Sequence, residues 1–342
     1  MPDDAAPIAP ELTTVAPEYA VVHDGGDVRC FDDLVADTDY EFDGFAFRTL
    51  PAPGELLATI ATVNDVHFGE TEAGVIEGVD IGPVLRSEPG SEPYPELMNR
   101  CAVAEIVGLE PDAVVVKGDL TSNGSTGEYE RFCAVYGEAF GNRLYHVRGN
   151  HDACHGGRFA AFDRQRIDVP GATVALIDTA IEEQANGQIA EETLDWLDTL
   201  AAEATGPVLV MGHHHCWNPD SDAREASFFG IDPADSLALV AVAERRRSIR
   251  GYFAGHTHRN QRQVFSATGE LPWVEVASVK DYPGSWAEYR VYEGGICQIH
   301  HRISDPDALA WSNRTRAMYA GLYTEYAFGT LQDRCFALPD RS

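Results

Sequence analysis

Five short segments of the sequence combine the residue types that bind first-row metal ions. They are Asp65-Val66-His67, Gly118-Asp119, Gly149-Asn150-His151-Asp152, His213-His214-His215 and Gly255-His256-Thr257-His258. Mixed carboxylate, amide and imidazole donors suit Mn, Fe, Co, Ni or Zn better than the metals that thiolates select. In the Asp-x-His and His-x-His pairs, residues two apart on extended backbone point to the same side, so both can reach one ion. These residues predict a metal centre.

Each of the five segments directly follows a short apolar run that has the length of a buried strand. Such runs occupy residues 57–63, 113–116, 144–147, 174–177, 208–211 and 252–254. Helical patterns lie between them near 96–109, 127–140, 190–203 and 235–249, and the pattern after Arg259 becomes β. Open α/β sheets place their sites at the carboxyl ends of strands. The sequence therefore predicts an α/β sandwich with the metal centre along one edge.

In this order, the five segments resemble the motifs of the calcineurin-like metallophosphoesterases, over roughly residues 56–302. Position 152 is Asp where Ser/Thr protein phosphatases have Glu, and Ser122 stands where purple acid phosphatases have a metal-binding tyrosine. The closest resemblance is to the bacterial branch similar to cyclic-nucleotide phosphodiesterases. It implies a four-layer α/β/β/α sandwich.

The resemblance also implies a binuclear metal centre. It assigns one ion to Asp65, His67 and His258, and the other to Asn150, His256 and one histidine of the run at 213–215, with Asp119 bridging both. Relatives have His-His-Pro at that run. Aligning Cys216 with the proline makes His214 the ligand, whereas anchoring the alignment on Gly212 makes it His213; we favour His214. The expected cofactors are two divalent or trivalent ions, of Mn, Fe or Zn.

The reaction that the resemblance implies is hydrolysis of a phosphoester by in-line attack of a hydroxide that bridges the two ions. His151 is expected to protonate the leaving oxygen or to stabilise charge in the transition state. Asp152 is expected to orient His151, and the alternative is a packed aspartate that caps the next helix. A small phosphodiester is the favoured substrate. The alternatives are a phosphomonoesterase and a non-catalytic relative that binds partner proteins.

Three segments are expected along the chain. Residues 1–55 contain a hairpin signal at 20–31 and further short strands, which predict a small β-rich appendage similar to a fragment of a fibronectin type III module. Residues 56–302 are expected to form the metallophosphoesterase domain. Residues 303–342 are expected to form a helical extension, with one amphipathic helix over 305–327. The long loop at 68–95 is a candidate lid over the substrate.

The composition of the chain argues against several classes of binding partner. The chain of 342 residues has 25 basic and 55 acidic side chains and a formal net charge of −30, which argues against nucleic acid polymers and anionic membrane surfaces. Lys117 and Lys280 are its only lysines. The chain has seven scattered cysteines without a CxxC pair, which predicts reduced thiols. Its N-terminus is acidic and it lacks a long apolar run, so we expect a cytoplasmic protein. A small phosphoester remains as the partner, and either flanking segment is a candidate for homo-oligomer contacts.

Overall fold

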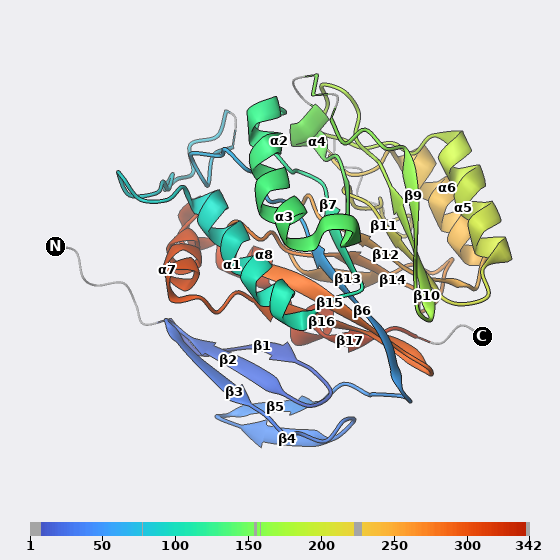
Figure 1. Cartoon of the computed structure of the whole chain (residues 1–342), viewed down its shortest axis with the longest axis horizontal. Helices are drawn as coiled ribbons and strands as arrows, with labels where there is room; N and C mark the ends of the chain where they lie inside the picture. Colours follow the sequence, from blue (N-terminus) through green and yellow to red (C-terminus); the bar gives the residue numbers. More distant parts are fainter. Residues whose placement is uncertain (1–7, 77, 154–155, 158, 222–227, 340–342) are drawn as a thin grey trace.

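The computed structural model describes residues 8–76, 78–153, 156–157, 159–221 and 228–339. Within them, two six-stranded sheets pack face to face (Figure 1). Apolar side chains from both sheets fill the space between them, including Ile60, Val115, Leu176 and Phe253. Because these strands are covered on both faces, their sequences are nearly continuous apolar runs.

The first sheet has the order β17-β16-β15-β6-β7-β8. Its parallel part consists of β6 (Leu56–Val63), β7 (Ala113–Lys117) and β8 (Leu144–Val147). Its antiparallel part consists of β15 (Ser285–Tyr292), β16 (Gly295–Arg302) and β17 (Phe336–Ala337).

The second sheet has the order β13-β14-β12-β11-β10-β9. Its parallel strands are β10 (Ala172–Ile177), β11 (Val208–Met211), β12 (Ile249–Ala254) and β14 (Pro272–Glu275). Its antiparallel edges are β9 (Arg164–Val169) and β13 (Gln261–Val264). Because β6, β7 and β8 run parallel in the first sheet and β10, β11, β12 and β14 run parallel in the second, several carboxyl strand ends meet at one edge of the sandwich.

Helices cover the outer face of each sheet. The first sheet is covered by α1 (Tyr94–Leu109), α2 (Thr126–Phe132), its π-helical and α3 continuation (Cys133–Gly137 and Glu138–Phe140) and α7 (Pro306–Thr315). The second is covered by α5 (Glu191–Glu203) and α6 (Pro233–Arg245). Short turns at η2 (Gly141–Arg143) and α4 (Asn150–Ala153) lie between elements. The predicted four-layer α/β/β/α sandwich is confirmed (Figure 1). In the described part of the chain, no helix combines the length and apolar character needed to cross a bilayer.

The C-terminal segment differs from its prediction. A single helix over 305–327 is wrong, because the chain leaves α7, makes the turn η3 (Tyr319–Gly321) and continues as α8 (Tyr323–Phe328) and α9 (Leu331–Arg334). Ala320 and Gly321 have φ angles of 56° and 86°, which a right-handed helix does not allow. Trp311 and Tyr323 then pack into the core of the first sheet's outer face, and β17 extends that sheet.

The N-terminal segment forms two small sheets below the sandwich (Figure 1). Their strands are β1 (Glu11–Val15), β2 (Ala20–Asp24), β3 (Asp27–Phe31), β4 (Asp39–Phe42) and β5 (Phe45–Arg48). Antiparallel pairing of β2 with β3 confirms the predicted hairpin. Leu12, Val22 and Phe47 share one buried cluster with Ile299 of β16. The division into three domains therefore stays a prediction, since the flanking segments share buried contacts with the sandwich.

His23 lies at the contact between the N-terminal sheets and the rest of the chain. Its Nδ1 is 2.8 Å from Thr13 Oγ1 and its Nε2 is 3.2 Å from Ser304 Oγ. Burial, helped by Arg302 and Arg316, lowers the pKa of His23 from 6.5 to about 3. The stability that depends on neutral His23 is therefore fully present above about pH 6.5 and is lost as the pH falls toward 3.

We expect His23→Gln to flatten the pH dependence of unfolding. In the wild type, His23 should lower the free energy of unfolding by about 2 kcal/mol between pH 7 and about pH 5. The reason is that at about pH 5 the histidine takes up a proton in the unfolded chain but stays neutral in the folded chain. Thermal unfolding of both proteins between pH 7 and pH 5 measures this. An equal fall in Tm for the variant and the wild type would contradict the assignment.

Candidate metal centre

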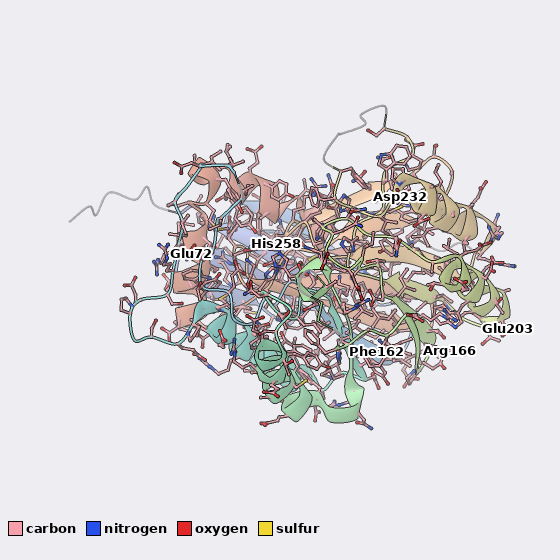
Figure 2. The ribbon with its side chains drawn as sticks, turned by 90° about the horizontal axis from the view of Figure 1, so that it is seen from above. Glu72, Phe162, Arg166, Glu203, Asp232 and His258 are labelled. Carbon is pink, nitrogen blue, oxygen red and sulfur yellow. The ribbon has the colours of Figure 1, made fainter. Side chains whose placement is uncertain are left out.

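The five motif segments meet at one edge of the sandwich. They follow the carboxyl ends of β6, β7, β8, β11 and β12. Figure 2 views the molecule from this side, with His258 near the middle of the face. The sheets therefore bring together residues from positions 65 to 258, as the sequence predicted.

Five of the candidate ligands have a backbone that is not extended. Asp65, His67, Asp119, His256 and His258 all have positive φ angles, between 48° and 69°. Such a conformation costs on the order of 1–3 kcal/mol for each residue and persists where its surroundings force it, which is characteristic of functional sites. This corrects the expectation that the Asp-x-His and His-x-His pairs converge through extended strands: the chain has already turned off each strand. His256 and His258 accordingly face two different groups of donors.

The first group consists of Asp65, His67 and His258, whose ligand atoms lie within 4.8 Å of one another. His258 Nε2 is 3.5 Å from Asp65 Oδ1. Asn64 Nδ2 donates to Asp65 Oδ2 over 2.6 Å, and Asn99 of α1 donates to the carbonyl of the residue between Asp65 and His67. Neighbouring amides thus hold this turn in place.

The second group contains His213, whose ring is fixed at both nitrogens. Nδ1 donates to the Lys117 carbonyl over 2.8 Å. Nε2 lies 3.1 Å from Asn150 Oδ1 and 3.3 Å from Asp119 Oδ2. Burial alone would lower the pKa of His213, but the adjacent Asp119 carboxylate outweighs it and raises that pKa to about 9.

His214 and His256 complete this group, with ligand atoms within 4.8 Å of one another and of His213. His214 Nδ1 lies 2.8 Å from Thr179 Oγ1, while its buried Nε2 has no hydrogen-bond partner among the described residues. His256 Nε2 donates to the Phe229 carbonyl over 2.9 Å, which leaves Nδ1 for a ligand. The structure brings His213 and His214 alike to the centre, so the choice between them stays a prediction.

Asp119 lies between the two groups. One of its oxygens is 3.4 Å from His67 Nε2 and 3.3 Å from His213 Nε2. Burial raises the pKa of Asp119, yet the His213 ring outweighs this and holds the pKa well below its usual range. Gly118 has a φ of +91°, and the His213 ring occupies the position that a Cβ of this residue would take. A Cβ at Gly149 would overlap the Asp119 carboxylate. The motif glycines therefore allow the ligands to approach.

Two cations fit this donor set. Asp65 and Asp119 are 0% and 1% exposed, and buried carboxylates at such close range need compensating positive charge. His214 Nε2 is a buried nitrogen without a hydrogen-bond partner among the described residues, and an unpaired buried polar atom is costly unless a ligand occupies it. Oxygen and imidazole donors together match divalent first-row metals.

The contacts of Asp152 correct its expected role. Its carboxylate accepts hydrogen bonds from the amides of Leu120, Thr121 and Gly149 over 2.8–3.0 Å. His151 instead places Nδ1 2.9 Å from the Ser122 carbonyl. Among the described contacts Asp152 thus fixes the loop after Asp119, as a packed structural aspartate, and the Ser122 carbonyl orients His151.

Sequence reasoning missed two carboxylates behind the first group. Glu70 Oε2 is 3.1 Å from His67 Nδ1, and Asp281 Oδ2 is 3.3 Å from His258 Nδ1. A carboxylate at the far nitrogen of a ligating histidine fixes its tautomer and ring orientation. Glu70 follows His67 by three residues and was detectable by that spacing. Asp281 lies beyond two further strands and had no such signal.

Residues 58–260 match the family model of the calcineurin-like phosphoesterases, which is more than half of the chain. The chain belongs to this family. It is a hydrolase that acts on phosphoester bonds, and the predicted family and branch are confirmed.

Curated relatives of this calcineurin-like phosphoesterase carry phosphodiesterase names. It is 29% identical over 293 residues to the glycerophosphodiester phosphodiesterase GpdQ of Enterobacter lignolyticus, covering 78% of this chain and 95% of that protein. It is 28% identical over 188 residues to a cAMP/cGMP dual specificity phosphodiesterase of Mycobacterium tuberculosis, covering 51% and 56%. The crystal structure of a dimetal phosphatase from Danio rerio superposes with a TM-score of 0.55 at 17% identity, covering 73% of this chain and 98% of that one. That likeness supports the fold alone.

Proposed function

We propose that this calcineurin-like phosphoesterase is a phosphodiesterase that uses two metal ions and acts on a small substrate. The observation that carries the proposal is the pair of donor groups that share Asp119. The first ion is assigned to Asp65, His67 and His258, and the second to Asn150, His214 and His256. Mn, Fe or Zn ions suit these ligands.

When bound, the two ions would generate a hydroxide nucleophile near neutral pH and polarise the phosphoryl oxygens. We assign proton transfer to His151, whose ring centroid is 4.5 Å from that of His67. Its Nδ1 donates to the Ser122 carbonyl, so Nε2 carries a proton only when the ring is an imidazolium. Burial lowers the pKa of His151, and the charge of Asp119 opposes this. We assign to the protonated ring the donation of a proton to the leaving oxygen.

A cavity beside the second group supports a diester over a monoester. It has a volume of about 360 Å³ and begins at the Phe229 loop, which accepts the hydrogen bond from His256. Its aromatic lining consists of His215, Trp217, Phe228, Phe229 and Tyr326. Among the described residues of the lining, the guanidinium group is that of Arg259, and this side chain binds Glu275 over 3.0 and 3.1 Å. Such walls suit the second organic substituent of a diester better than the second negative charge of a monoester.

The test compares bis-p-nitrophenyl phosphate with p-nitrophenyl phosphate after loading the protein separately with Mn, Fe and Zn. We expect metal-dependent turnover, with kcat/KM for the diester at least about tenfold higher, or about 1.4 kcal/mol in transition-state binding. Chelator-treated protein is the control. A preference for the monoester would favour the phosphomonoesterase alternative. Lack of turnover with every metal would favour the non-catalytic relative.

A further inference from the structure

Lys280 joins the two carboxylates that lie behind the first donor group. Its Nζ is 2.8 Å from Glu70 Oε2 and 3.3 Å from Asp281 Oδ2. Those carboxylates lie 3.1 and 3.3 Å from Nδ1 of His67 and His258, respectively. A continuous chain of contacts therefore runs from the His67 ring through the Lys280 ammonium and its two carboxylates to the His258 ring. The Nε2 atoms of both histidines face the first donor group.

The surroundings of Lys280 are closed to solvent. Lys280 is 4% exposed and Asp281 is 1% exposed. Removing the ammonium from water is costly, and such a group is kept in a protein interior only where anions compensate it. Lys280 is also one of only two lysines among the 25 basic residues of the chain. Its head group therefore serves the two carboxylates and not a surface contact.

The C-terminal segment holds this arrangement from behind. Trp311 of α7 donates from Nε1 to the Lys280 carbonyl over 2.8 Å. Tyr323 of α8 donates from its hydroxyl to Asp281 Oδ1 over 2.6 Å, and Ser278 donates to the same oxygen over 3.0 Å. These donors come from residues beyond the stretch 58–260 that matches the family model.

We propose that Lys280 is a positioning residue for the first metal ion. By neutralising Glu70 and Asp281 together, it holds each carboxylate against the far nitrogen of its histidine and so fixes both rings for binding through Nε2. Without the ammonium, the two carboxylates repel each other and the rings lose their common support. The segment that carries Trp311 and Tyr323 is then part of the metal site. This inference rests on the proposed two-metal function.

The experiment measures Mn²⁺ binding to the metal-free full-length chain by titration calorimetry, without substrate. We expect Lys280→Met to weaken one of the two ions by about 10–100-fold, the effect of losing support behind a ligand, and to leave the other within about threefold. Lys280→Arg, which keeps the charge, should retain more of the affinity. Arg290→Met is the matched control, because Arg290 is a buried cation that pairs with Glu18 and Glu288 away from the centre. It should lower Tm without changing either affinity.

Unchanged affinities in Lys280→Met, or an equal loss for both ions, would overturn the proposal. If Lys280→Met does not fold, Tyr323→Phe tests the proposal instead, because this substitution removes only the hydroxyl that binds Asp281. A severalfold loss for the same ion supports the positioning role, and no loss overturns it. Wild-type protein that binds fewer than two ions would count against the proposed function instead, which separates the two failures.

Discussion

Asp119→Asn is expected to lose metal and to reduce phosphodiester turnover by roughly 10⁴-fold or more, since the two ions supply both nucleophile activation and charge stabilisation. The Asp119 carboxylate lies 3.3–3.4 Å from nitrogens of both donor groups and is the charge that they share. The amide keeps the shape of the side chain but not the negative charge that holds two cations together. One substitution should therefore affect both sites.

Metal content after gel filtration and turnover of bis-p-nitrophenyl phosphate measure this effect. Asp168→Asn is the matched control, because Asp168 is an exposed aspartate on β9 that binds Arg166 far from the motif segments. It should retain two ions and full turnover. Two ions retained by Asp119→Asn at wild-type affinity would contradict the shared role of this carboxylate.

His151→Ala is expected to reduce kcat by about 10²–10⁴-fold, the range for loss of a general acid, while both ions stay bound. The ring lies beside His67 and is held by the Ser122 carbonyl, outside the proposed ligand set. If the ring protonates the leaving oxygen, the loss should be small for diesters of acidic phenols, whose leaving groups need no proton, and large for diesters of aliphatic alcohols. An equal loss for both classes would favour stabilisation of transition-state charge.

Stopped assays with the two substrate classes, together with metal analysis, measure this prediction. His146→Gln is a suitable control, because His146 is a partly buried histidine of β8 that contacts the Tyr129 hydroxyl and lies outside both donor groups. Its turnover should match the wild type once folding is verified. Turnover of His151→Ala within threefold of the wild type on alkyl diesters would exclude both roles of His151.

The sequence alone was sufficient to predict the four layers of the sandwich and most of the residues that meet at the candidate metal centre. Apolar runs at strand length alternate with helical patterns, and a metal-binding residue type follows five of the runs. Because parallel strands end at one edge, the order of motifs places Asp65, Asp119 and His256 together without knowledge of any contact. The same pattern could not show that these residues adopt positive φ, since such a conformation depends on contacts in the folded chain, such as those that Asn64 and Asn99 make around Asp65.

The tertiary structure alone decided which groups support the ligands. The Ser122 carbonyl, and not Asp152, orients His151, and a backbone carbonyl has no signature in a sequence. Asp281 reaches His258 across the two strands that separate them, and Lys280 reaches Glu70 from 210 residues away. The sequence determined the ligand types and their place at strand ends, because local hydrophobic patterning encodes strands. Only the folded chain determined how the rings are held, because buried charges choose their partners by distance in space and not along the chain.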